Sequence, residues 1–94
     1  MNYIYGLVCP IDGTVKYIGV TKDIKARMRI HRTSKANKDV YKWTLKLKRF
    51  GKMFYHIVLD TDENRLSAYH KEQALIKEYT KTIFNINSKK HTTF

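Results

Sequence analysis

The first twenty residues contain two segments rich in aromatic and β-branched side chains, which favour strands. These segments are 2–8 and 14–20, and the run Pro10-Ile11-Asp12-Gly13 lies between them. A proline and a glycine between two such segments are typical of a turn. The pattern therefore predicts a β-hairpin.

The length of the hairpin loop decides which residue lies opposite Tyr5. A three-residue loop at 11–13, with its glycine in the left-handed conformation, places Tyr5 opposite Gly19. Tyr17 then lies on the same side of the sheet as Tyr5. A two-residue turn would instead pair Tyr5 with Val20 and put the two tyrosines on opposite faces. The hydrophobic pattern leaves both registers open.

Helical spacing follows the hairpin in two segments. In the first, Thr21 is a candidate N-cap with Asp23 in the first turn, and the inward face combines apolar and polar residues: Ile24, Arg27, Met28 and His31. After a polar loop at 32–39, the second helix has an inward face consisting of Val40, Trp43, Thr44, Leu45, Leu47 and Phe50. Gly51 favours the end of this helix.

The remaining pattern predicts a third strand at 53–60 and a long helix that begins at Asp62 or Asn64 and ends near Thr80. On this helix Glu72 interrupts an otherwise apolar stripe. Residues 83–86 are expected to close the fold. The expected organisation is a single α+β domain over 1–87, with a three-stranded antiparallel sheet flanked by helices, and a flexible tail at 88–94.

Charge is distributed very unevenly along the chain. The 94 residues have a formal net charge of +11, with 19 lysine and arginine residues against 8 acidic ones. Twelve of these cations and only two acids lie between Lys22 and Lys52, so this segment has a net charge of +10. Such a segment attracts phosphate through counterion release, so a nucleic acid is the expected partner. The candidate contacts are Lys22, Lys25, Arg29, Arg32, Lys42, Lys46 and Arg49.

Several other classes of protein are excluded by what the sequence lacks. It has no apolar run of membrane-spanning length and no signal-peptide pattern, so no membrane partner is expected. The single Cys9 makes no internal disulfide and has no metal-ligand spacing, which favours a reducing, cytoplasmic setting. A composition rich in lysine, isoleucine and asparagine is consistent with an AT-rich source such as a phage or mobile element, with nucleoid or phage DNA as the location.

Polar residues at inward-facing positions form the candidate site. A buried charge without a partner is costly, so such residues usually meet one another or a ligand. Arg27 can clamp a phosphate and stabilise charge in a transition state, and Glu72 is a hard oxygen ligand suited to Mg²⁺. His31 or a tyrosine can move a proton. Since tyrosine has a pKa of about 10, Tyr5 needs nearby Mg²⁺ or cations to act as a base near neutrality. The inventory suits phosphodiester hydrolysis.

The two hairpin segments contain Tyr3-Ile4-Tyr5 and, after eleven intervening residues, Tyr17-Ile18-Gly19. These resemble the two motifs that name the GIY-YIG nuclease family, and the sequence resembles this family at six places, in the family's order. The other places of resemblance are 20–31 with Arg27 and His31, 48–54, 69–76 with Glu72, and 83–86 with Asn85. The likeness covers roughly residues 2–87, and it slightly favours the three-residue hairpin loop.

The resemblance implies hydrolysis of DNA with one Mg²⁺ or Mn²⁺ ion. It implies that Tyr5 is the general base or orients the water, that Tyr17 and His31 assist, and that Arg27 stabilises the phosphate. Accounts of the family differ on how proton transfer is shared among the two tyrosines and the histidine. Glu72 would hold the metal, and Asn85 would steady the site by hydrogen bonding. Cleavage would then be weakly sequence-selective, directed by a targeting partner protein, or made more selective by self-association.

Tyr3 departs from the family pattern, because the first motif has glycine at this position. This departure and the basic segment are the features that favour an alternative function, a catalytically inactive nucleic-acid-binding regulator on a nuclease fold. A third function, binding of an acidic protein, requires only the basic segment and explains none of the inward polar residues. The complete set of site residues favours the enzyme.

Overall fold

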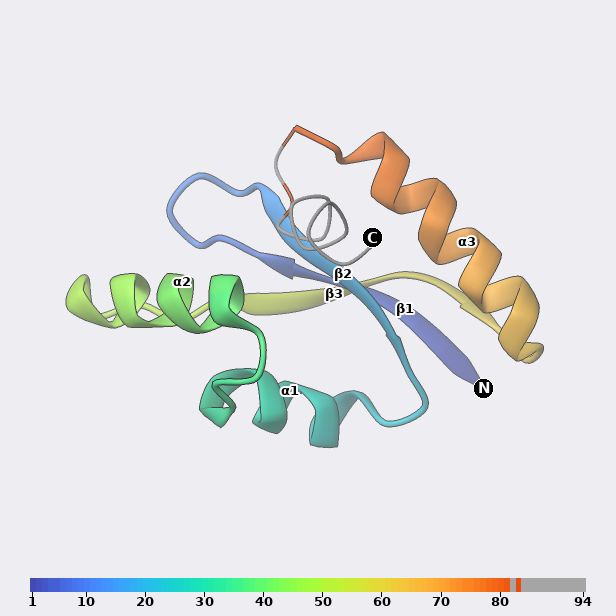
Figure 1. Ribbon diagram of the computed structural model, residues 1–94, viewed down its shortest axis with the longest axis horizontal. Helices are drawn as coiled ribbons and strands as arrows, with labels where there is room; N and C mark the ends of the chain where they lie inside the picture. The colour runs from blue at the N-terminus through green and yellow to red at the C-terminus, as the bar shows by residue number, and fades with distance from the viewer. Residues whose placement is uncertain (82, 84–94) are drawn as a thin grey trace.

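The computed structural model describes residues 1–81 and 83, and it has the predicted three-stranded antiparallel sheet with helices (Figure 1). Asn85 and the predicted tail at 88–94 lie outside the described residues. The elements in chain order are β1 (Asn2–Val8), β2 (Val15–Thr21), α1 (Ile24–Thr33), α2 (Lys38–Arg49), β3 (Tyr55–Asp62) and α3 (Arg65–Glu78). The strand order is β2-β1-β3, so β1 is central.

The hairpin between β1 and β2 places Tyr5 opposite Gly19, as a three-residue loop would, but by a different route. Cys9 N donates to Thr14 O at 2.8 Å, so the loop has four residues, from 10 to 13, and is longer than either of the two predicted loops. A register shift between Leu7 and Val8 restores the Tyr5 pairing. Gly13 has a φ of 73°, the left-handed conformation expected at this turn.

The two faces of the sheet bury separate hydrophobic clusters. Helices α1 and α2 cover the face of Tyr5 and Leu7, whereas α3 covers the face of Ile4 and Ile18 (Figure 1). This division follows from the strand period of two, because alternate residues of β1 point to opposite faces. Strand β2 forms one edge of the sheet and β3 the other.

Side-chain caps begin all three helices. The N-cap of α1 is Asp23, which accepts from Ala26 N at 3.1 Å, and not Thr21 as predicted. Thr21 lies two residues earlier, where its hydroxyl accepts from Asp23 N at 3.1 Å and so orients the capping residue. Asn37 and Asn64 cap α2 and α3 in the same way.

Helix α2 ends where its glycine was predicted to end it. Gly51 has a φ of 67°, and Lys52 N donates back to Leu47 O at 2.9 Å, which satisfies a terminal carbonyl group. The buried residues of α2 are Val40, Trp43, Thr44 and Leu47. Leu45 and Phe50 were predicted to face inward, but they are 43% and 61% exposed. Leu45 lies off the buried stripe, and Phe50 is the C-cap, beyond the last helical turn.

The third strand begins at Tyr55, two residues later than predicted. Phe54 belongs instead to the core, where its ring stacks on Trp43 with centroids 5.5 Å apart. Strand β3 pairs with β1 along its length and has no second strand beside it in the described sheet. Its residues Tyr55, Ile57 and Val58 are exposed.

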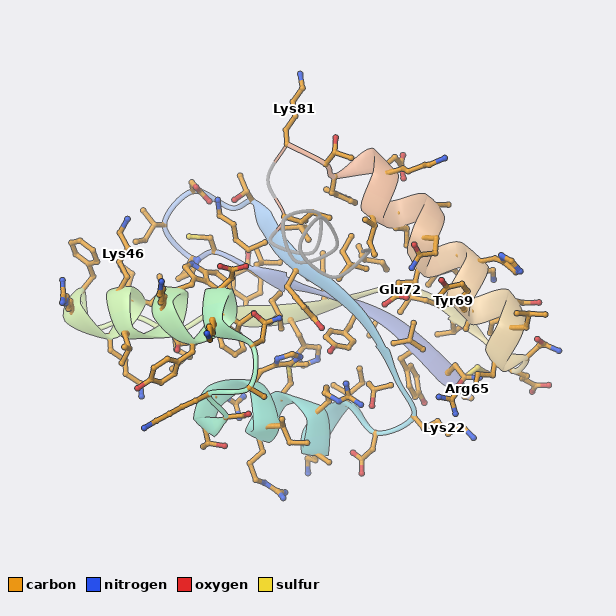
Figure 2. All side chains as sticks on the ribbon, in the orientation of Figure 1. Lys22, Lys46, Arg65, Tyr69, Glu72 and Lys81 are labelled. Carbon is orange, nitrogen blue, oxygen red and sulfur yellow. The ribbon has the colours of Figure 1, made fainter. Side chains whose placement is uncertain are left out.

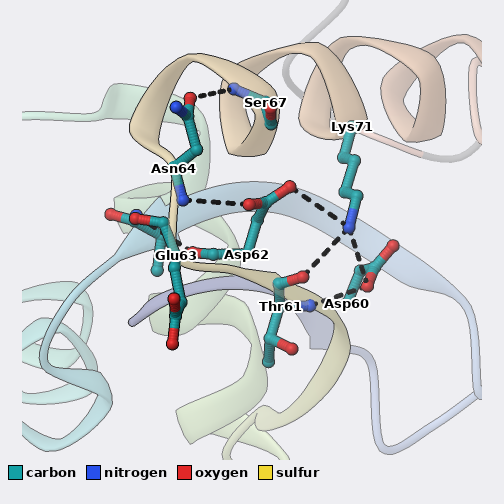
Figure 3. A network of polar contacts seen from close by, with 8 residues as sticks. Asp60, Thr61, Asp62, Glu63, Asn64, Ser67 and Lys71 are labelled. Atoms are coloured by element: carbon teal, nitrogen blue, oxygen red, sulfur yellow. Dashed lines mark hydrogen bonds and ion pairs between the residues drawn. The ribbon is translucent and has the colours of Figure 1, made fainter.

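A network of polar contacts fixes the corner between β3 and α3 (Figure 3). Lys71 Nζ lies 3.3 Å from Asp62 Oδ2 and 3.5 Å from Asp60 Oδ1, and it donates to Thr61 O at 3.0 Å. Asn64 N donates to Asp62 Oδ1 at 2.9 Å, and this bond, followed by Lys71, holds the pKa of Asp62 below its usual range. The network therefore sets the orientation in which α3 leaves the sheet.

Candidate active site

Two tyrosines and a histidine gather on the sheet face that α1 covers. The rings of Tyr5 and Tyr17 have centroids 6.4 Å apart, and the ring of His31 packs edge-on against Tyr17 at 5.1 Å. The strand register places both tyrosines on this face, and the third turn of α1 brings His31 to them. The proximity of the two tyrosines, which the sequence predicted for one of its two registers, is confirmed.

A short hydrogen bond joins Tyr5 to His31. The Tyr5 hydroxyl lies 2.7 Å from His31 Nε2 in a buried setting. Burial, followed by repulsion from Arg27, lowers the pKa of His31 from its usual 6.5 to about 4. Burial also raises the pKa of Tyr5 well above its usual value. Both groups are therefore neutral near pH 7, and the hydroxyl donates when the histidine carries its hydrogen on Nδ1.

Arg27 supplies the positive charge of this cluster. Its guanidinium opposes the rise in the pKa of Tyr5, both by its charge and by a hydrogen bond. The same charge opposes the rise in the pKa of Tyr17, whose main causes are burial and then the carboxylate of Glu72. Arg27 and Glu72 thus both act on the tyrosines, although they come from helices on opposite faces of the sheet.

Gly19 is required by the ring of Tyr5. A Cβ atom at position 19 would lie 2.5 Å from the Tyr5 hydroxyl oxygen and 2.7 Å from Cζ, closer than real Cβ atoms approach. The Tyr5 side chain is fully buried, so the ring has no room to withdraw. This close approach is the physical reason for the glycine in the Tyr17-Ile18-Gly19 segment.

A cavity of about 580 Å³ opens where α1 and α3 meet around the β2 edge. Tyr17, Arg27 and Glu72 line it together, whereas Tyr5 and His31 do not. Tyr5 therefore reaches His31 and Arg27 from behind the cavity wall, and Tyr17 is the tyrosine that faces the cavity. Tyr3, at the position where the family motif has glycine, is half-buried and is not part of the lining.

The cavity has the donor set expected for a lightly coordinated hard cation. Within residues 1–81 and 83, no three His, Cys, Asp or Glu side chains gather to form a metal cage. Mg²⁺ typically keeps several waters and takes only one or two protein carboxylates. The carboxylate of Glu72, with the neighbouring hydroxyl of Tyr17, fits this requirement. Asp23 also lines the cavity, but its carboxylate caps α1.

The seven predicted DNA contacts are all exposed, but they do not form one continuous surface around the cavity. Lys22 lines the cavity, and Lys25, Arg29 and Arg32 follow along α1. Lys42 and Lys46 line a second cavity of about 450 Å³ beside the hairpin loop. Figure 2 shows Lys22 and Lys46 far apart in the view, on different parts of the molecule.

The cavity lining includes a cation and an aromatic ring that were not among the predicted site residues. Arg65 and Tyr69 come from α3 and precede Glu72 at helical spacing, so that all three face the cavity (Figure 2). That spacing was the available signal. The last predicted site residue, Asn85, lies outside the described residues.

Among residues 1–81 and 83, no helix is long and apolar enough to cross a membrane.

Comparison with known proteins identifies one family. The family model described as the GIY-YIG catalytic domain matches residues 1–87, which is nearly the whole chain. No curated protein and no solved structure gives a significant match.

Proposed function

Because the chain belongs to the GIY-YIG family of nucleases, we propose that it is a divalent-metal-dependent endonuclease that hydrolyses phosphodiester bonds in DNA. The observation that carries this proposal is the common cavity of Tyr17, Arg27 and Glu72, with the Tyr5–His31 hydrogen bond directly behind it. The cluster combines a hydroxyl, a cation, a carboxylate and an unprotonated nitrogen base. These are the groups that hydrolysis of a phosphodiester needs.

Arg27 binds the phosphate. Its guanidinium lines the cavity and is positively charged. Two N–H groups of the fork can donate to two phosphate oxygens, and the charge opposes the negative charge that develops as the phosphorus is attacked. Glu72 would hold Mg²⁺ or Mn²⁺, which when bound supplies Lewis-acid polarisation of the phosphate and lowers the pKa of bound water.

Tyr17 orients the attacking water, since its hydroxyl faces the cavity whereas that of Tyr5 is covered. The water oxygen bonds to phosphorus, and the phosphorus–oxygen bond to the leaving group breaks. The Tyr17 hydroxyl passes the water's proton toward the Tyr5–His31 pair behind the cavity wall, and the leaving oxygen takes a proton from solvent. The Nε2 atom of neutral His31 is the acceptor in this pair. Negative charge on the bound phosphate favours protonated histidine, which raises the pKa of His31 during the reaction.

The proposal is tested by incubating the purified protein with plasmid DNA and Mg²⁺ or Mn²⁺. We expect nicked or linear DNA, and we expect Glu72→Gln and Arg27→Ala to lower the rate by about 100-fold or more. Tyr17→Phe and Tyr5→Phe should lower the rate to a similar degree while leaving DNA binding nearly unchanged. A parent protein as inert as these variants on varied DNA substrates would contradict the proposal and favour the non-catalytic binding function.

A further inference from the structure

The face of α3 that leads into the active-site cavity carries an exposed aromatic ring. Arg65, Tyr69 and Glu72 follow one another along this face, and all three line the cavity (Figure 2). Tyr69 is 51% exposed although its ring borders a site. Its ring contact among the described residues is a T-shaped one with His70, so no described ring stacks on Tyr69.

Two cations line the cavity together with this ring (Figure 2). Lys22 comes from the turn between β2 and α1, and Arg65 is the first residue of α3. A cation at this end of a helix is disfavoured by the helix dipole. Arg65 also forms no ion pair with any residue of 1–81 or 83. Its position therefore contributes little to the fold, whereas it is suited to an anion entering the cavity.

The size of the cavity suits a single nucleotide. About 580 Å³ lies within the range of pockets that hold a small ligand, about 300–1,000 Å³, and a nucleotide is a ligand of this class. A strand whose phosphate reaches Arg27 thus presents one base near the cavity rim, where Tyr69 offers the face of an aromatic ring.

We propose that Tyr69 is a stacking platform for an unpaired base next to the scissile phosphate, and that Lys22 and Arg65 bind the flanking phosphates. This inference rests on the proposed function, because it assigns a substrate class to the same cavity. That class is DNA with an unstacked nucleotide, as in a bulge or a single-stranded segment. Base stacking on aromatic side chains is largely independent of sequence, so the site reads strand geometry rather than base identity.

The test measures DNA binding in EDTA, so that no cleavage is needed. Two duplexes of the same sequence are compared, one fully paired and one with a single bulged 2-aminopurine. We expect the parent protein to bind the bulged duplex more tightly than the paired one. Binding should also change the fluorescence of the 2-aminopurine in the bulge. Tyr69→Ala should lower this preference by about tenfold, and Tyr69→Phe and Tyr69→Trp should keep it, because they keep a stacking face. Arg65→Ala should weaken binding of both duplexes.

Tyr55 provides the matched control, since it is also a 51% exposed tyrosine but lies on β3, away from the cavity lining. Tyr55→Ala should leave the preference unchanged. The inference is overturned if Tyr69→Ala keeps the parental preference, or if Tyr55→Ala reduces it equally. A protein that binds the bulged duplex through Tyr69 but cleaves no DNA with any metal would remove the proposed nuclease activity and leave the stacking site standing.

Discussion

The closest packing in the site is between two residues of the hairpin, Tyr5 and Gly19. Their pairing follows from the register, and the register depends on a bulge between Leu7 and Val8 that the sequence pattern does not reveal. The resemblance implies that Tyr5 activates or orients the water, and this role stays a prediction. Whether a strand residue is exposed depends on what packs over it. Here α1 covers Tyr5 and leaves Tyr17 on the cavity. The local sequence pattern identified both tyrosines, but it did not show that one is covered and the other lines the cavity.

Gly19→Ala should damage both the fold and the site. The new Cβ would meet the fully buried Tyr5 ring, so the ring must move and its hydrogen bond to His31 breaks. We expect a decrease of about 1–3 kcal/mol in the free energy of unfolding, measured in urea, together with loss of cleavage. Gly6→Ala is the control, since the nearest atom to its Cβ is Val15 Cγ1 at 3.2 Å. An equal decrease in both variants would contradict this explanation.

His31 should make the protein less stable as the pH falls. The unfolded chain takes up a proton at this residue near pH 6.5, whereas the folded chain does so only near pH 4. Since the unfolded state binds the proton first, stability present above pH 6.5 is lost progressively toward pH 4.

The measurement for His31 is urea unfolding between pH 7 and pH 5, above the range in which most carboxylates titrate. The variant His31→Gln should lose less stability over this interval than the parent. His70→Gln changes an exposed histidine of α3 and should keep the parental slope. If His31→Gln also keeps that slope, the histidine does not have the lowered pKa.

Among the elements, the end of α2 at Gly51 and the start of α3 at Asn64 lie where the sequence predicted them, because a glycine and a capping residue are strong local signals. The cap of α1 and the start of β3 were misplaced by two residues each. Thr21 and Asp23 are both good capping residues, and their own hydrogen bond decides between them. Phe54 has strand propensity, but stacking on Trp43 places it in the core before β3 begins. Both outcomes depend on tertiary packing that propensity does not include.

The orientation of α3 should depend on Lys71, which joins this helix to the end of β3. Because these ion pairs lie at the surface, Lys71→Met should lower the midpoint of urea unfolding only slightly. Glu72 is the next residue, so the change should displace its carboxylate more than it lowers the stability of the fold. We expect a higher Mg²⁺ concentration for half-maximal cleavage. Lys77→Met, an exposed change on the same helix, should leave that concentration unaltered; a rise in both variants would reflect the removed charge alone.

At the scale of the whole molecule, the cations of the positive segment lie at two separate cavities. The sequence located the charge correctly between Lys22 and Lys52, but it could not show how two helices distribute that charge in space. Arg27 enters the active-site cavity, whereas Lys42 and Lys46 border the cavity beside the hairpin loop. Position along a helix is readable from sequence, and the angle between two helices is set by their packing on the sheet.

This distribution predicts two different effects when cations are removed. Changing Lys42, Lys46 and Arg49 to glutamine should weaken DNA binding at low salt. It should also reduce the slope of log affinity against log salt by roughly 0.9 for each phosphate that the variant no longer neutralises. Arg27→Ala should mainly abolish cleavage.

The control for this charge prediction changes two exposed cations elsewhere, Lys77 and Lys81, to glutamine. This variant should bind nearly as the parent does. Affinity is measured by fluorescence anisotropy over a range of salt concentrations. If this slope falls equally in the control and in the triple variant, the affinity for DNA depends on the net charge of the protein and not on the surface of α2.

The outer edge of β3 has a consequence for how the protein behaves at high concentration. Its exposed Tyr55, Ile57 and Val58 lie in the first part of the strand, residues 55–59, which contains no lysine, arginine, proline or acidic residue. Charged residues and proline are the ones that usually keep a strand edge from adding another strand. Elsewhere the charge of +11 keeps copies apart, but salt screens that repulsion. At high protein and salt concentration we therefore expect copies to aggregate by pairing at this edge. Val58→Lys should reduce that aggregation.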